Sequence, residues 1–300
     1  MALHLLSYNL QGLSSQEARD KTRLFVQNLH PRIDILCIQE HKLRDAHTAF
    51  LSRQIWPHVE FVVAPASDGV HARRNNVVLA GKRGNLIAVG PRLKGSITAR
   101  GTLPSGCGSW VHLDHFSFGL LGVLSVYAPN EKLERALLWR ELFSILDPDR
   151  PWIIASDFNN VEDPADQRGG KGKGSLIAGQ EKIAWLHFKR RFKLEDSHFL
   201  RPGMLKFSWD NQRKDRHDPA SQAGDISRSR CLRRLDRVYY SDCNNKLCIS
   251  TSILPGYFFS DHAPVLAQIE VDGVVSRPTV YRMNASHLKH LELLRKLEAI

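Results

Sequence analysis

Short apolar runs that end in carboxylate, amide or imidazole side chains occur in both halves of this sequence. The runs are brief and rich in β-branched residues, which is typical of buried strands. The polar residues at or just beyond their ends are Asn9, Glu40, Asp157 with Asn159, and Asp261 with His262. A single Asp or Asn at a strand end is usually a turn former, but two packed sheets would gather all of these ends at one edge. The pattern therefore predicts two sheets that share a polar edge.

Helical segments are predicted between the apolar runs, and this alternation indicates an α/β fold. A helix capped by Ser14 or Ser15 should end near His30, because Pro31 stops it. Two more helices are predicted over residues 132–146 and 180–192. The predicted strands cover residues 4–10, 33–38, 59–64, 77–80, 86–89, 110–113, 118–127, 152–156, 235–240, 247–253 and 264–271.

The charge balance favours a polyanionic partner. The 300 residues include 42 Lys and Arg against 31 Asp and Glu, a net charge of +11, which suits nucleic acid first and an acidic membrane surface second. Apolar stretches such as residues 118–126 are far shorter than the ~20 residues that a membrane helix needs. We therefore expect no membrane partner.

The N-terminus and the cysteines predict an intracellular protein. The first residues have neither a basic region before an apolar core nor a small-residue cleavage site, so they do not form a signal peptide. The five cysteines are odd in number and scattered, which argues against a secreted disulfide framework.

A basic segment lies between two of the candidate site segments. Between Trp209 and Leu235 the chain carries seven Lys or Arg and four Asp, which leaves +3. Such a segment is often only a solvated surface, but its position between two site segments favours contact with phosphates. The DNA-binding candidates are Arg213, Lys214, Arg228, Arg230 and Arg233, together with Ser208 and Trp209 at the start of the segment.

Seven short motifs carry a family resemblance. They are Ser7-Tyr-Asn-Leu-Gln-Gly12, Ile38-Gln-Glu-His41, Val126-Tyr-Ala-Pro-Asn130, Ser156-Asp-Phe-Asn159, Phe207-Ser-Trp209, Leu235-Asp-Arg-Val-Tyr239 and Ser260-Asp-His262. In this order and spacing they resemble the endonuclease/exonuclease/phosphatase superfamily over residues 4 to 270. The segment from Asp157 to Pro164, the nearby Arg-Gly-Gly and the succession from Phe207 to Arg237 further resemble the endonuclease domains of LINE-type, non-LTR retrotransposons.

The resemblance implies a fold and a chemistry. The fold would be a four-layered α/β sandwich in which two packed β-sheets are flanked by helices, and the activity would be phosphodiester cleavage with Mg²⁺, or alternatively Mn²⁺. The implied roles are metal binding by Glu40 beside Asn9, phosphate binding by Tyr127, water positioning by Asp157 and Asn159, and completion of the site by Asp261 and His262, with Asp236 holding the imidazole. Gln11 stands where many repair enzymes of the family have aspartate, which argues against repair of abasic sites.

We expect a DNA endonuclease that nicks duplex DNA and leaves a 3′ hydroxyl for target-primed reverse transcription. Its partners would be nuclear duplex DNA and a reverse transcriptase region of a parent polyprotein. A phosphatase or phospholipid-head hydrolase on the same fold is one alternative, and it would not need the basic segment. A DNA-binding module that has lost catalysis is another.

The chain is expected to divide into a catalytic domain and a tail. The endonuclease/exonuclease/phosphatase domain would span residues 1–271, followed by a linker and helical tail over residues 272–300 that leads toward a reverse transcriptase region. Leucines recur at helical spacing in this tail, at Leu288, Leu291, Leu294 and Leu297. The alternative is a terminal helix that docks on its own domain.

Overall fold

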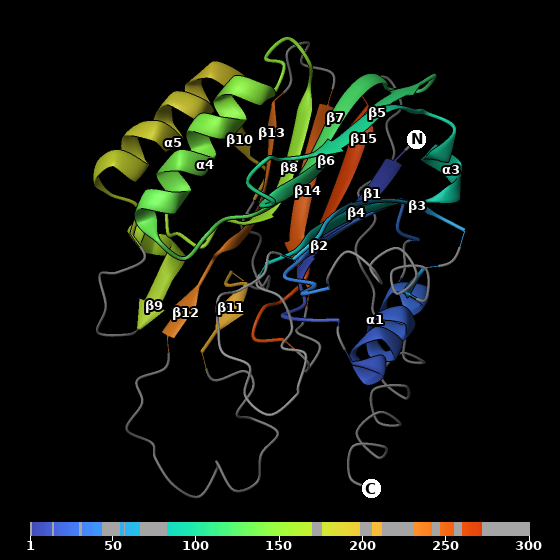
Figure 1. The fold of residues 1–300 in the computed structure, drawn as a ribbon, viewed down its shortest axis with the longest axis horizontal. Coiled ribbons are helices and arrows are strands. Elements are labelled where there is room, and N and C mark those ends of the chain that lie inside the picture. The colour runs from blue at the N-terminus through green and yellow to red at the C-terminus, as the bar shows by residue number, and fades with distance from the viewer. Residues whose placement is uncertain are drawn as a thin grey trace, which may run out of the picture.

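The computed structural model describes residues 2–13, 15–29, 32–43, 55–56, 58–66, 83–169, 176–198, 206–211, 231–241, 247–254 and 260–271. Two six-stranded sheets pack face to face (Figure 1). In spatial order the first sheet contains β14 (Leu247–Ile253), β15 (Val265–Val271), β1 (Ala2–Asn9), β2 (Ile35–Gln39), β4 (Asn85–Val89) and β3 (Glu60–Ala64). The second contains β10 (Glu195–Asp196), β13 (Asp236–Ser241), β8 (Trp152–Asp157), β7 (Gly119–Tyr127), β6 (Gly108–His115) and β5 (Ile97–Thr102).

Helices cover the outer faces of both sheets (Figure 1). Helix α1 (Gln16–Asn28) packs on the first sheet, and α4 (Lys132–Ile145) and α5 (Gly179–Phe192) pack side by side on the second. A short helix, α3 (Pro91–Lys94), and a 3₁₀ turn over Pro164–Asp166 complete the helical elements of the described segments. The predicted four-layered α/β sandwich is confirmed. No helix in the described segments is both long and apolar enough to cross a membrane.

The strands are continuously apolar because both of their faces are buried. On β1, Leu3 and Leu5 lie in the core between the two sheets, whereas Leu6 and Tyr8 lie in the core beneath α1. Successive side chains of a strand point to opposite faces, so a sheet covered on both sides needs apolar residues at every position. A third core fills the space between the second sheet and helices α4 and α5.

Each sheet contains one parallel strand pair that is connected through a helix. In the first sheet β1 is parallel to β2, and α1 connects them. In the second sheet β7 is parallel to β8, and α4 connects them. Parallel strands end on the same side of a sheet, so each pair delivers two loops to one place. We call the region where these four strands end the polar edge.

A third, small sheet lies beyond the polar edge (Figure 1). It consists of β11 (Trp209–Asp210), β12 (Cys231–Arg233) and β9 (Gln167–Gly169). Trp209 pairs with Arg233 across β11 and β12, and Arg233 pairs with Gln167 across β12 and β9. These three side chains therefore share one face of the small sheet.

Most of the predicted elements agree with the structure to within a few residues, and Ser15 is the N-cap of α1, its hydroxyl accepting the Ala18 N–H at 3.1 Å. Strand β5 was not predicted, because an edge strand with an exposed arginine and a glycine carries little apolar signal. The small sheet was also not predicted. The strand predicted over residues 77–80 and the tail after residue 271 lie outside the described residues.

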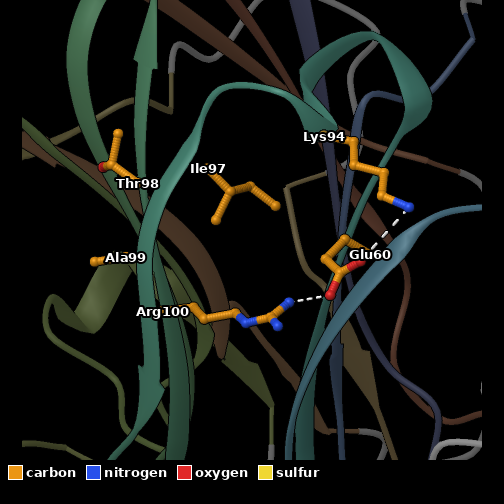
Figure 2. Close-up of a pocket in the computed structure, with 6 residues that line it drawn as sticks. All are labelled: Glu60, Lys94, Ile97, Thr98, Ala99 and Arg100. Carbon is orange, nitrogen blue, oxygen red and sulfur yellow. Dashed lines mark hydrogen bonds and ion pairs between the residues drawn. The ribbon is translucent and has the colours of Figure 1, made fainter.

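The edge strands of the two sheets, β3 and β5, border an open pocket of about 340 Å³. Figure 2 shows Arg100 and Lys94 reaching Glu60 from opposite sides, with Ile97 between them. Charged side chains on edge strands discourage pairing with other chains. The pocket contains none of the candidate site residues, so we interpret it as edge protection.

Gly122 on β7 provides a test of the packing inside the second sheet. A Cβ atom at this position would lie 2.5 Å from Cε3 of the Trp152 ring. Gly122→Ala should therefore destabilise the protein by about 1–3 kcal/mol, because a closely packed indole has little room to move. Urea unfolding would measure the change. The control is Gly95→Ala, where a Cβ meets nothing within 4 Å; equal unfolding midpoints for the two variants would contradict the packing described here.

Candidate active site

The polar edge brings the eight predicted catalytic and metal-binding side chains into one connected group. β1 contributes Asn9, and the residue after β2 is Glu40. β7 and β8 end at Tyr127 and Asp157, and β13 begins at Asp236. The other three members are Asn159, Asp261 and His262, which lie in loops beside these strand ends.

Asn9 and Asp157 join the two sheets. Asn9 Nδ2 donates to Asp157 Oδ2 at 2.8 Å, and the backbone N–H of Asn159 donates to Asp157 Oδ1 at 2.9 Å. The Asp157 carboxyl group is almost fully buried. Burial raises its pKa, the negative charge of Asp236 raises it further, and the positive charge of His262 opposes both effects. Asp157 is therefore a stronger proton acceptor than an exposed aspartate.

His262 and Asp236 form a buried ion pair. His262 Nδ1 lies 2.7 Å from Asp236 Oδ2. Burial lowers the pKa of His262, but the charges of Asp236, Asp157 and Asp261 outweigh burial and raise the pKa to about 10. At neutral pH the ring is therefore an imidazolium. Its Nε2 lies 3.9 Å from Asp157 Oδ2 and 3.8 Å from Asp261 Oδ1, so the second N–H points into the group of carboxylates.

Asp261 is held through both of its oxygens. The side-chain amide of Gln11 donates to Oδ1, and the Trp209 indole N–H donates to Oδ2 at 3.1 Å. The backbone N–H of Gln11 also donates to Asn9 Oδ1 at 3.0 Å. Gln11 therefore fixes two members of the site through hydrogen bonds from uncharged amide donors.

The Tyr127 hydroxyl interacts with the side chains of both Glu40 and Asn159. Burial and the nearby carboxylates of Glu40 and Asp157 raise the pKa of Tyr127, so its hydroxyl keeps its proton. Asn159 is fixed in turn, because its Nδ2 donates to the Ala128 carbonyl at 2.7 Å. Tyr127 is thus a neutral hydrogen-bond donor beside two carboxylates.

Backbone strain gathers at the polar edge. The non-glycine residues Gln11, Glu40, Lys42 and Asn159 have φ angles of 55°, 52°, 57° and 48°. This left-handed conformation costs energy for residues with a Cβ, and it is retained where the surroundings require it. Lys42 contributes a cation here: its Nζ lies 3.2 Å from Glu40 Oε2 and donates to the Gln11 carbonyl at 2.9 Å.

The donor set fits a hard divalent cation. Among the described residues, Asp157, Asp236 and His262 offer potential ligand atoms within 4.8 Å of one another. Their ion pairing already accounts for this closeness, since an imidazolium has no lone pair for a metal. Glu40 is better suited, because its partly exposed carboxylate already forms an ion pair with Lys42, and it directly follows Gln39, the residue that pairs with Asn9 on the neighbouring strand. Carboxylate and amide oxygens are the ligands that Mg²⁺ prefers.

The structure places the predicted DNA-binding residues in different environments. Ser208 is fully buried, and its hydroxyl accepts the N–H groups of Leu235 and Asp236 at 3.0 and 2.9 Å. Ser208 therefore supports Asp236 and does not face solvent. Trp209 is partly exposed, and the Arg233 guanidinium lies 5.2 Å from the centre of its ring. The remaining candidates, Arg213, Lys214, Arg228 and Arg230, lie outside the described residues.

Two residues with a supporting role were missed from the sequence. Gln39 donates to the hydroxyl groups of Ser7 and Ser125, each at 3.1 Å, and so links the two sheets directly beneath Glu40. His41 is fully buried: its Nε2 lies 3.0 Å from the Ala64 carbonyl, and its Nδ1 accepts the Leu43 N–H at 2.9 Å. The available signal was the run of polar residues 39–42 that begins at the last residue of a buried strand.

The geometry agrees with comparisons to known proteins. A sequence model described as the Endonuclease/Exonuclease/phosphatase family matches residues 6–262. The fold is similar to that of the AP endonuclease LMAP from Leishmania major, with 18% identity, coverage of 90% of this chain and 88% of that one, and a TM-score of 0.63.

Two further solved structures are similar at low sequence identity. An AP endonuclease from Archaeoglobus fulgidus is 15% identical over 90% of this chain and 99% of that one, with a TM-score of 0.60. The human Nocturnin catalytic domain with bound sulfate anion is 15% identical over 90% and 94%, with a TM-score of 0.54. Among curated proteins, none matches the sequence closely enough to count as a relative.

The buried ring of His41 predicts a pH-dependent stability. Burial lowers its pKa to about 4 from an ordinary value of 6.5. The unfolded chain therefore takes up the proton first, so the contribution is present above pH 6.5 and is lost as pH falls toward 4. The loss should be about 3 kcal/mol. Chemical denaturation between pH 7 and 4.5 should give a shallower pH dependence for His41→Gln than for the wild type, and parallel curves would contradict this role for the ring.

Proposed function

Because this chain belongs to the endonuclease/exonuclease/phosphatase family, we propose that it is a divalent-metal-dependent phosphodiester hydrolase that nicks duplex DNA and leaves a 3′ hydroxyl. The observation that carries the proposal is the buried ion pair of His262 with Asp236, which places an imidazolium between Asp157 and Asp261. A phosphodiester carries negative charge, and its hydrolysis needs both a cationic donor and a proton acceptor at one place.

The two roles are divided among the residues of the polar edge. Asp157 accepts a proton from the attacking water, and its raised pKa suits this task. Asn159 is neutral and orients the water without repelling the phosphate. His262 donates a hydrogen bond from its Nε2–H to a phosphate oxygen, while Asp236 keeps the ring charged and fixes its orientation. The Tyr127 hydroxyl donates a hydrogen bond to a second phosphate oxygen.

Glu40 and Asn9 would hold the metal ion. When bound there, Mg²⁺ or Mn²⁺ supplies neutralisation of negative charge on the phosphoryl and leaving oxygens. Gln39 fixes the backbone from which Glu40 projects.

Duplex DNA is proposed as the substrate because the surface beside the site is basic and aromatic. Arg233 and Trp209 lie together on the small sheet, and Trp209 is tied to Asp261 through its indole N–H. Arg168 on the neighbouring strand β9 is exposed. The net charge of +11 also suits a polyanion. A phosphate contact at Arg233 would thus stand at a fixed position relative to the catalytic groups.

The 3′ hydroxyl is proposed to prime reverse transcription. The support is the sequence resemblance to LINE-type endonuclease domains, in the segment after Asp157 and in the succession from Phe207 to Arg237. In this scheme the chain acts on nuclear DNA, and a reverse transcriptase region of a parent polyprotein uses the nick. A primer-extension assay on nicked plasmid would test whether the new end is a free 3′ hydroxyl.

Glu40→Gln tests the proposed metal ligand. The amide has nearly the shape of the carboxylate but no charge, so the fold should persist while Mg²⁺-dependent plasmid nicking falls by about 10²-fold or more. Glu17→Gln on the exposed face of α1 is the matched control and should nick like the wild type. Nicking by Glu40→Gln at the wild-type rate in low Mg²⁺ would reject Glu40 as the ligand.

A triple variant tests DNA binding by the basic segment. Arg228, Arg230 and Arg233 are changed together to Ala, and DNA affinity is measured from low to moderate salt. Loss of three phosphate contacts should flatten the plot of log affinity against log salt by ~2 to 3 units, whatever the DNA sequence.

The control for this variant removes the same charge elsewhere. Arg190, Arg191 and Lys193 are exposed at the end of α5 that lies away from the polar edge. Changing them together to Ala should leave the salt dependence unaltered. If the two triple variants give the same slope, the segment between Trp209 and Leu235 has no specific role in binding DNA.

A further inference from the structure

We propose that Arg135 is a positioning residue, which fixes the loops after β7 and β8 relative to one another through a buried chain of hydrogen bonds. The inference rests on the proposed function, because these loops matter for catalysis only if Tyr127 and Asp157 act on a substrate. Arg135 lies on α4, and only 1% of its surface is exposed. It is not at the polar edge itself and contacts none of the eight site residues among its hydrogen-bond partners.

The guanidinium of Arg135 uses all three of its nitrogens. Nε and Nη2 donate to the two carboxylate oxygens of Glu181 on α5, at 2.5 and 3.1 Å. Nη1 donates to the carbonyls of Pro129 and Asn130, at 2.8 and 2.5 Å. These carbonyls follow Tyr127 by only two and three residues. The planar fork therefore holds the loop after β7 against helix α5.

Glu181 extends the chain to the loop after β8. Its Oε1 also accepts from Asn160 Nδ2 at 3.1 Å, and Asn160 directly follows Asn159. Asn160 in turn accepts from Arg237: its Oδ1 lies 3.1 Å from Nη1, and its backbone carbonyl accepts from Nη2. Arg237 directly follows Asp236. One chain of hydrogen bonds thus reaches the three segments that carry Tyr127, Asn159 and Asp236.

Stability alone gives a poor account of this arrangement. Arg135, Glu181, Asn160 and Arg237 are each at most 1% exposed. Removing charges from water costs nearly as much as their attraction returns, so apolar side chains of similar volume are often as stabilising as a buried ion pair. Apolar side chains cannot fix the carbonyls of an irregular loop, whereas a guanidinium does so with defined angles. We therefore explain these buried charged side chains by their role in holding the loops after β7 and β8 in position.

The test compares the wild type with a double variant, Arg135→Met with Glu181→Met. The apolar pair should fill the same space and keep the protein folded, which urea unfolding would verify. The single variant Arg135→Met leaves the Glu181 carboxylate buried without its cation, so it serves only to show that the two residues are coupled.

Hydrogen exchange gives the first readout, and it needs no substrate. In the double variant the amides of residues 127–131 and 157–161 should exchange at least tenfold faster than in the wild type, while those of β1 and β15 should not change. A residue that only stabilised the fold would change all of these segments together or none of them. Unchanged exchange in the two loops would overturn the proposal.

Steady-state kinetics give the second readout. Misplacing Tyr127 and Asp157 should lower kcat on Mg²⁺-dependent plasmid nicking by about 10- to 100-fold and change KM by less than about twofold, since the proposed DNA contacts on the small sheet, at Arg233 and Trp209, are untouched. Arg135→Lys should recover part of the kcat that the Met substitutions remove, because lysine keeps the positive charge but lacks the planar guanidinium group. Arg140→Met, at an exposed position of the same helix, should behave like the wild type.

The two readouts separate this proposal from the proposed function. A wild-type protein that fails to nick DNA would refute the proposed function, and hydrogen exchange would still decide whether Arg135 orders the loops. A double variant whose loops exchange faster but whose kcat equals that of an active wild type would show that the order is not needed for catalysis, and would overturn the positioning role.

Discussion

The hydrogen bond between Asn9 and Asp157 joins the two sheets, and these two residues are 148 positions apart in the chain. It forms only because the two parallel strand pairs, β1 with β2 and β7 with β8, end at the same edge of the sandwich. The carboxyl ends of parallel strands are a recurrent place for ligand sites, since loops from separate segments converge there. Every other feature of the site depends on this convergence.

Electrostatic compensation is the second requirement. Glu40, Asp157, Asp236 and Asp261 place four carboxyl groups at the polar edge, and in the described part of the chain His262 and Lys42 bring positive charge among them. Burying so many carboxylates would be unfavourable without partners, which is why the pKa of Asp157 rises and that of His262 rises as well. In the proposed mechanism this balance of charge suits a phosphate and a divalent cation.

The helices α4 and α5 do more than cover a sheet. Their apolar faces complete the third core with Trp139, Trp185 and Phe188, while Arg135 and Glu181 carry charge into the same layer. The aromatic residues account for the packing of this layer. The charged residues face the loops after β7 and β8, so one layer provides both cohesion and alignment.

Sequence by itself determined the α/β sandwich and most of its strands, because a strand buried on both faces must be apolar at every position, as in residues 33–38. It also placed Asn9, Glu40 and Asp157 at strand ends. It did not disclose β5 or the small sheet, whose short, polar strands have no periodic signal.

Only the tertiary structure decided which polar residues act together. Ser208 was expected at the DNA surface, and burial instead assigns its hydroxyl to the backbone beside Asp236. Arg135 and Glu181 look like ordinary charged residues on helix surfaces until the packing of α4 on α5 buries them. Local sequence specifies which apolar residues a segment buries, whereas the burial and pairing of polar and charged residues from distant segments depend on long-range contacts that no local pattern records.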